Sequence, residues 1–147
     1  MIEVRKASPL DAEAIKIISD EVLATESWSL AQYTADLSDP DKHYFVADID
    51  DIVVGFIGYA LIVDEAHIMN LAVKESQQGQ GVGQSLVRAL LDDAVSHNAV
   101  GATLEVRISN DRAKKLYLKT GFTSSGVRPH YYSGGEDAVI LWNYFTD

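Results

Sequence analysis

The sequence contains no cysteine. This absence excludes a disulfide-stapled scaffold, a thiolate zinc site, an iron–sulfur cluster and a cysteine acyl-enzyme. It also has no apolar run long enough to span a bilayer. The opening segment, from Met1 to Lys6, lacks the apolar stretch of a secretory signal peptide. We therefore expect a cytoplasmic protein without a membrane partner.

Positive charge is scarce in the first half of the chain. Residues 1–73 carry four Lys or Arg and 14 Asp or Glu, whereas residues 74–147 carry eight of each. A net charge of −10 makes the chain a poor binder of nucleic-acid backbones, which are contacted through Lys and Arg. The acidic excess leaves two interpretations open: a solvated face that aids solubility, or a surface that attracts a cationic partner.

The length and composition are those of one soluble globular domain. The chain has 147 residues, of which 47% are apolar and 23% charged. A chain of this length buries roughly two-thirds of its unfolded surface, so it needs no metal staple. The four histidines show no metal-ligand spacing, so we expect no metal; they are His43, His67, His97 and His130.

Apolar periodicity predicts a mixed α/β domain across residues 1–147. Strands are expected at 2–7, 44–49, 52–63, 66–73, 103–108, 122–127 and 138–145. Four helices are expected over about 8–24, 29–39, 82–95 and 110–120, the last closed by Gly121. The short connections between residues 44 and 73 predict antiparallel pairing, and hence a mostly antiparallel central sheet flanked by helices.

A glycine-rich segment between a strand and a helix is the most informative motif. It places Gly79, Gly81 and Gly83 where successive backbone N–H groups can point into one concavity beside a helix N-terminus. Such a site binds anions, most simply a pyrophosphate. The spacing matches neither the ATP-binding P-loop nor the dinucleotide fingerprint. The remaining alternative is a glycine-rich turn that binds no ligand.

The pattern Gln78-x-x-Gly81-x-Gly83 after Leu71-Ala72-Val73 resembles the acetyl-CoA signature of the Gcn5-related N-acetyltransferase (GNAT) superfamily. The resemblance covers essentially the whole chain. It implies that the backbone of a strand splayed from its neighbour at a bulge, at Leu71, Ala72 and Val73, binds the pantetheine arm. It also implies that the loop holds the pyrophosphate of acetyl-CoA, through Gln78, Gly79, Gln80, Gly81, Val82, Gly83 and Gln84.

Further short motifs are similar to those of the RimI-type N-terminal acetyltransferases. They are Leu104-Glu105-Val106-Arg107, Ser109-Asn110, Leu116-Tyr117, Gly121-Phe122, Tyr131-Tyr132 and Glu136-Asp137-Ala138. This resemblance implies Glu105 as general base and Tyr117 as general acid, with Asn110 bonded to the CoA arm. It implies a peptide slot walled by Trp28, Tyr131 and Tyr132. The acceptor would be a protein N-terminus, with the N-terminal alanine of a ribosomal protein as one candidate.

Each of these residues also has a purely structural interpretation. Glu105 shares a strand face with Arg107 and could simply pair with it on the surface. Tyr117 on a helix is compatible with a core aromatic, and Asn110 with a helix N-cap. Trp28 could only anchor its loop.

The loop departs from the family pattern at three positions. Gly79 and Gln84 stand where basic residues are frequent, and Glu75 stands where proline is frequent. Binding of the phosphates would then depend more on backbone N–H groups, with Lys74 or Arg112 as compensating charges.

The chemistry favours an α-amino acceptor. Its pKa of about 7.7–8.0, against about 10.4 for lysine, leaves far more of the neutral amine near pH 7. With no cysteine available, direct attack on the thioester in a ternary complex is expected. Two rival functions remain: acetylation of a small amine such as a polyamine or an antibiotic, and a non-catalytic CoA-binding module. The oligomeric state is left open.

Overall fold

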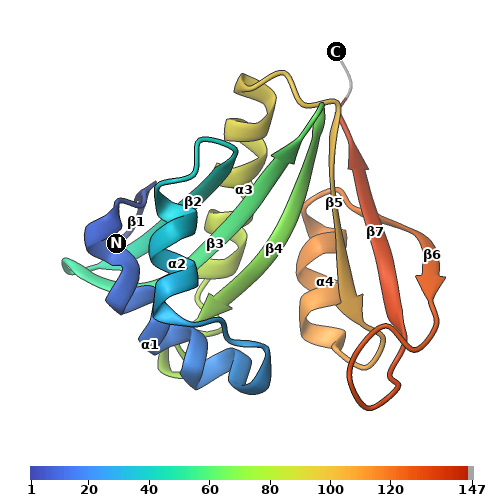
Figure 1. The fold of residues 1–147 in the computed structure, drawn as a ribbon, viewed down its shortest axis with the longest axis horizontal. Coiled ribbons are helices and arrows are strands. Elements are labelled where there is room, and N and C mark those ends of the chain that lie inside the picture. Colours follow the sequence, from blue (N-terminus) through green and yellow to red (C-terminus); the bar gives the residue numbers. More distant parts are fainter. Residues whose placement is uncertain (146–147) are drawn as a thin grey trace.

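Seven strands form one sheet in the order β1-β2-β3-β4-β5-β7-β6 (Figure 1). The computed structural model describes residues 1–145. The strands are β1 (Ile2–Lys6), β2 (Lys42–Ile49), β3 (Ile52–Ile62), β4 (Glu65–Val73), β5 (Gly101–Arg107), β6 (Thr123–Arg128) and β7 (Ala138–Tyr144). Every neighbouring pair is antiparallel except β4 and β5, which run parallel. The predicted mostly antiparallel sheet is therefore confirmed.

Four α-helices cover the two faces of the sheet. They are α1 (Ala12–Leu23), α2 (Leu30–Leu37), α3 (Val82–Ser96) and α4 (Asp111–Lys119). Helices α1 and α2 lie on one face, and α3 lies on the other (Figure 1). Three short 3-10 helices are added: η1 (Pro9–Asp11), η2 (Ala24–Glu26) and η3 (Glu75–Gln77). The predicted order of strands and α-helices is confirmed. Among residues 1–145, no helix is both long and apolar enough to cross a membrane.

Each face of the sheet has its own core. Buried side chains of α3, such as Leu86 and Leu90, pack with Ile57 of β3 in the larger cluster. On the opposite face, Ile15 and Ile18 of α1 pack with other buried residues of the sheet and of α2. The apolar stripes found by periodicity are thus the sides of the helices that face the sheet.

Local signals explain where the first helices begin. Ser8 and Asp11 form a reciprocal capping box, in which the Ser8 N–H donates to Asp11 Oδ2 at 2.8 Å. The predicted helix start is correct, but its first turn is the 3-10 helix η1. Helix α2 begins after Ser29, whose hydroxyl accepts a hydrogen bond from the Gln32 N–H at 3.1 Å.

The pairing of β4 with β5 stops after three residues. Glu65–His67 pair with Gly101–Thr103, and the two strands then diverge (Figure 1). A bulge in β4 accompanies the divergence: Gly58 pairs with Asn70 and Tyr59 with Ile68, so Met69 is the extra residue. The remainder of β4 keeps its ladder with β3 but has none with β5. The expected splayed strand is therefore present, and it opens the sheet at its centre.

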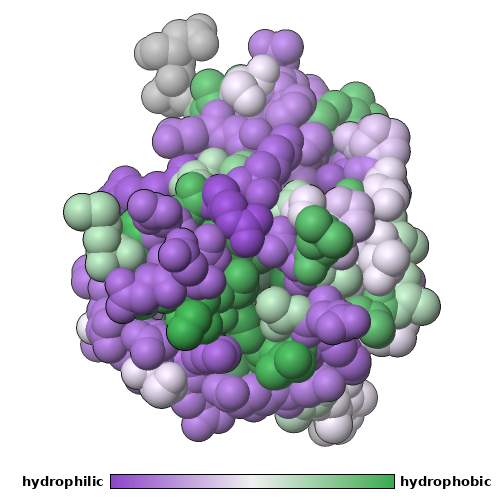
Figure 2. All heavy atoms as spheres, turned by 90° about the vertical axis from the view of Figure 1, so that its left-hand side faces the viewer, coloured by the Kyte–Doolittle hydropathy of each residue, from purple (hydrophilic) through white to green (hydrophobic). Residues whose placement is uncertain are grey.

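The acidic first half of the chain contributes a strongly polar surface. Figure 2 shows the left-hand side of Figure 1, which carries β1 and α1, as a mostly hydrophilic face with a smaller group of hydrophobic residues in its lower part. This polar face agrees with a solvated surface.

Replacing Gly58 by alanine is expected to destabilise the fold. A Cβ at Gly58 would lie 2.6 Å from Cε2 of Tyr44. The Tyr44 ring is held in place because its hydroxyl donates to Asp36 Oδ2 at 2.8 Å. Overpacking of this kind costs about 1–3 kcal/mol of unfolding free energy. Urea unfolding of the Gly58→Ala variant measures the loss.

Gly126 provides the matched control, since it also lies beside a register shift in a strand. A Cβ there would meet only Ile140 Cδ1, at 3.9 Å. Gly126→Ala is expected to change the stability by less than Gly58→Ala. Equal stabilities of the two variants would contradict the tight contact at Tyr44.

Candidate active site

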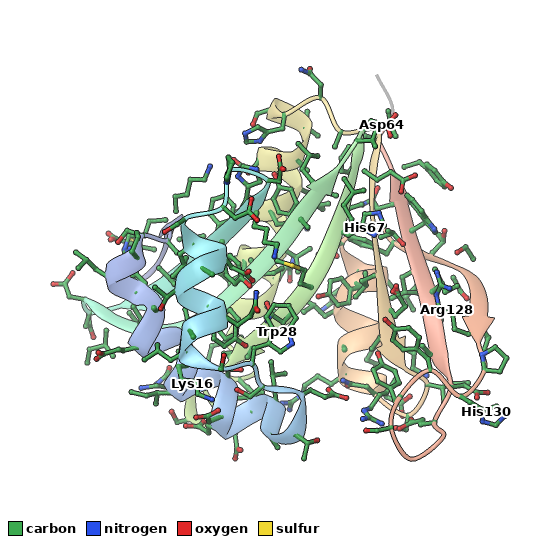
Figure 3. The ribbon with its side chains drawn as sticks, in the orientation of Figure 1. Lys16, Trp28, Asp64, His67, Arg128 and His130 are labelled. Atoms are coloured by element: carbon green, nitrogen blue, oxygen red, sulfur yellow. The ribbon has the colours of Figure 1, made fainter. Side chains whose placement is uncertain are left out.

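The divergence of β4 from β5 opens onto a cavity of about 450 Å³. It is lined by residues of both strands, of α4, of the segment before α2 and of the loop between β6 and β7. Figure 3 shows Trp28 over β4 and His67 between the two strands. The cavity brings together a large part of the predicted site: Trp28, Leu71, Glu105, Asn110, Tyr117, Tyr131 and Tyr132.

Glu105 lies on β5 at the wall of the cavity. Its neighbours Leu104 and Val106 are buried, each 6% exposed, and they project from the opposite face of the strand. Arg107 shares the face of Glu105 but pairs with Glu26 and Glu136. Among residues 1–145, the carboxylate of Glu105 has no hydrogen-bond or ion-pair partner. The surface pairing of Glu105 with Arg107 is thus not formed.

Tyr117 belongs both to the core and to the cavity wall. It is 3% exposed, and its ring packs edge-on against Phe122 with centroids 5.2 Å apart. The core interpretation of Tyr117 is therefore confirmed, and its role as general acid stays a prediction. Burial raises the pKa of the Tyr117 hydroxyl, so this group stays protonated around neutral pH.

Arg107 closes one side of the cavity. Its guanidinium lies 2.6 Å from the carboxylate of Glu26 and 3.0 Å from that of Glu136, and it sits 4.3 Å from the centre of the Tyr132 ring. The hydrogen bonds from Ser109 and from Arg107 lower the pKa of Glu136. Burial, with the nearby Glu26 charge, raises the pKa of Tyr132 to about 12. This network joins η2 to β5 and to the loop before β7.

The Arg107 network was missed by the sequence analysis. Only the shared strand face of Glu105 and Arg107 pointed to it. Several further residues line the cavity although no sequence motif predicted a role for them. They include Leu23, Glu26, His67, Ile68, Met69, Asn70 and Ala113.

The predicted aromatic wall is present, although its members differ in exposure. Trp28 stacks on Tyr33, with centroids 5.7 Å apart, so it anchors its loop and lines the cavity at once. Tyr131 is 52% exposed and packs edge-on against Tyr132 at 5.0 Å. These rings form an apolar rim at the mouth of the cavity.

Two of the three loop glycines are required by the backbone. Gly79 and Gly81 have φ of +81° and +88°, and a Cβ on either would meet no atom within 4 Å. Gly83 differs, because it lies inside the first turn of α3 and a Cβ there would be 3.1 Å from Leu116 Cδ2. Gly83 therefore serves close packing of α3 on α4, whereas Gly79 and Gly81 give the loop its positive φ angles and have open space beside them.

The glycine-rich loop leads directly into the N-terminus of α3. The amides of Val82, Gly83 and Gln84 have no acceptor within the helix, whose first hydrogen bond runs from the Ser85 N–H to the Gly81 carbonyl at 3.0 Å. Val82 as a whole is buried at 1% exposure. Free amides and the helix dipole are the features that attract anions, so the pyrophosphate site stays a prediction here.

Gln78 holds the loop in position. Its side-chain amide donates to the Val73 carbonyl at 2.9 Å, and its carbonyl accepts from Arg112 of α4. The loop itself does not line the cavity. Helix α4 connects the loop and the cavity, since its Leu116 lies beside Gly83 while its Tyr117 lines the cavity.

The predicted strand segment and Asn110 also have structural roles. Ala72 pairs with Phe56, is buried at 2% exposure in the core, and does not line the cavity. Asn110 caps α4, because its Oδ1 accepts from the Ala113 N–H at 3.1 Å. Asn110 lines the cavity as well, and its side-chain NH₂ is not used by the cap.

Comparison with known proteins agrees with this geometry. The model of the acetyltransferase (GNAT) family matches residues 12–122. A Bacillus subtilis protein named as a candidate [ribosomal protein bS18]-alanine N-acetyltransferase is 36% identical over 120 residues, which cover 80% of each chain. An N-alpha-acetyltransferase of Sulfurisphaera tokodaii is 31% identical, covering 94% of this chain and 90% of its own.

Solved structures show the same fold. The ribosomal-protein-S18-alanine N-acetyltransferase of Escherichia coli superposes with a TM-score of 0.90 at 27% identity, covering 100% of this chain and 96% of the other. Ard1 from Thermoplasma volcanium gives 0.89 at 30% identity and covers 99% of both chains. Because the family model spans well over half of the sequence, this chain belongs to the GNAT family of acetyltransferases.

Proposed function

We propose that this GNAT acetyltransferase acetylates the α-amino group of a protein N-terminus, by direct attack of the amine on acetyl-CoA in a ternary complex. The observation that carries the proposal is the meeting of Glu105 and Tyr117, from β5 and α4, in one cavity between the splayed strands. The relatives named as N-terminal acetyltransferases support the class of acceptor. The N-terminal alanine of a ribosomal protein is our candidate acceptor, which would place the enzyme in the cytoplasm.

The residues present fit acetyl-CoA, the cosubstrate typical of this family. The open space beside Gly79 and Gly81 leaves room for a pyrophosphate, and the free amides at the start of α3 would bind it. The edge of β4 beyond His67, which has no ladder with β5, would bind the pantetheine arm through peptide groups. Acetyl-CoA supplies the activated thioester; the chain supplies position and proton transfer.

Glu105 is the proposed general base. Its carboxylate has no competing partner among residues 1–145 and faces the cavity, so it is free to take a proton from an incoming ammonium, directly or through water. Since an α-ammonium has a pKa of about 7.7–8.0, one carboxylate suffices for this step near pH 7.

Tyr117 is the proposed general acid for the departing sulfur. Its hydroxyl lines the cavity and is protonated near pH 7, so it can donate a proton as negative charge develops on the thiolate. A backbone N–H of β4 near Leu71 would stabilise the developing negative charge on the thioester oxygen.

The mouth of the cavity suits a peptide end. Trp28, Tyr131 and Tyr132 supply apolar contact area. Glu26 lines the same cavity and is paired with Arg107. The negative excess of residues 1–73 would attract a basic peptide.

Removing either proposed proton-transfer group is expected to slow catalysis. Glu105→Gln and Tyr117→Phe should each lower kcat by at least about tenfold, and by up to roughly ten-thousandfold, with smaller effects on KM. Steady-state rates of thiol release measure the effect. Glu13→Gln and Tyr144→Phe, exposed positions on α1 and β7, are the controls and should retain the rate. If neither site variant is slowed tenfold, the assignment of the two roles is wrong.

Replacing Gly81 by alanine is expected to weaken binding of CoA. A side chain at φ +88° strains the backbone by about 1–2 kcal/mol, and the loop relieves this strain by moving its amides. Calorimetry should show a Kd for CoA raised by roughly five- to thirtyfold.

Gly134→Ala is the matched control for this prediction. Gly134 also has positive φ, +92°, and equally open surroundings, but it lies in the loop before β7. Its variant should bind CoA like the unmodified protein. Unchanged affinity in Gly81→Ala, or an equal loss in both variants, would speak against a phosphate site at this loop.

A screen of acceptors tests the class of amine. Peptides with N-terminal alanine and several Lys or Arg residues should release CoA thiol faster than polyamines or aminoglycosides. Raising the salt concentration should increase KM for the basic peptides, because screening weakens the attraction. Turnover of small amines alone would overturn the N-terminal proposal, and a KM insensitive to salt would remove the electrostatic contribution.

A further inference from the structure

Three potential metal ligands meet far from the catalytic cavity. His43 lies on β2, and Asp93 and His97 lie near the C-terminal end of α3. One ligand atom of each residue lies within 4.8 Å of those of the other two. The expectation that the histidines form no metal set rested on sequence spacing. The packing of α3 against β2 creates this cluster, which spacing does not reveal.

The distances are close to those of a tetrahedral site. Nδ1 of His97 is 3.4 Å from Oδ2 of Asp93, and Nδ1 of His43 is 3.9 Å from the same oxygen. Ligands bound to zinc at about 2.0–2.1 Å in a tetrahedral arrangement are roughly 3.3 Å apart. His97 Nδ1 also lies 2.9 Å from the Asp93 carbonyl oxygen, to which it donates, so this hydrogen bond must be released before the nitrogen can bind an ion. Rotation of the His43 and His97 rings would then let the three side chains bind one ion.

The ring of His43 is buried, stacks on Tyr59 with centroids 5.0 Å apart, and lies 4.5 Å from the His97 ring between centroids. It is 8% exposed, and neither ring nitrogen has a hydrogen-bond partner among residues 1–145. Burial, with the nearby charges of Lys6 and His97, lowers the pKa of His43, while Asp93 and Asp41 oppose this effect. A neutral imidazole is the form that binds metal ions.

Surrounding groups orient the carboxylate and leave access to it. The Tyr59 hydroxyl donates to Asp93 Oδ2 at 2.7 Å, as outer partners of metal-bound carboxylates do. His43 and Lys6 line a surface depression of about 270 Å³ through which an ion could enter. Lys6 Nζ is 3.8 Å from Asp93 Oδ1, and its side chain is 55% exposed, so it can move into solvent when an ion binds.

We propose that His43, Asp93 and His97 bind one divalent transition-metal ion of the zinc class, with water completing the coordination. Two imidazoles and one carboxylate select such ions over Mg²⁺ and Ca²⁺, which prefer oxygen ligands. None of the three residues lines the catalytic cavity. The bound ion fastens the end of α3 to β2 and stabilises the fold without taking part in acetyl transfer.

Calorimetric titration of the purified, chelator-treated protein with Zn²⁺ tests the site. One equivalent should bind to the unmodified protein and to the control His130→Ala, which alters a histidine of the loop before β7. Binding should be lost in His43→Ala and in Asp93→Asn. At Zn²⁺ 100-fold above Kd, the Tm should rise by about 5 °C or more, whereas Mg²⁺ should leave it unchanged.

Two further measurements keep the test independent of variants that fold poorly. Co²⁺ added to the unmodified protein should give the intense visible absorption of a tetrahedral site. Lys6→Gln removes the competing ammonium and should tighten Zn²⁺ binding by roughly fivefold, a change that unfolding cannot mimic. Absence of Zn²⁺ binding to the unmodified protein, or binding that survives in both His43→Ala and Asp93→Asn, overturns the proposal.

Discussion

The candidate active site depends on the short hydrogen-bonded pairing between β4 and β5. β4 and β5 share only three paired residues, and the bulge at Met69 accompanies the departure of β4 from its neighbour. On its other side, β5 is paired with β7 along its whole length, from Gly101 to Arg107. Glu105 is therefore held on a firmly paired strand that faces an open gap. A continuous sheet at this place would leave neither a cavity nor a free strand edge.

Helix α4 sets the distance between the two parts of the site. Its Leu116 packs against Gly83, its Arg112 contacts Gln78, and its Tyr117 lines the cavity. Asn110 caps the helix and so fixes where it begins. The anion-binding loop and the cavity are consequently positioned by one nine-residue helix, and any shift of that helix would alter both.

Much of this arrangement could be predicted from the sequence because its signals are local. Periodicity located the strands and helices, and Gly79 and Gly81 adopt the positive φ angles that favour glycine. What local signals could not supply were the contacts made across the fold. Arg107 meets Glu26, 81 residues away in the chain. Likewise, Gly83 allows α3 to pack closely on α4, and this contact could not be predicted from the position of Gly83 in the motif.

The free edge of β4 has an evolutionary consequence. It consists of peptide groups, which every residue except proline provides in full. Substitutions at Leu71 or Val73 that preserve the strand leave this edge intact, whatever side chains they introduce. Side chains at these positions can therefore change during evolution while the peptide groups of the free edge stay available for binding. The identity of these side chains is a weak guide to whether a distant homologue has kept the same free strand edge.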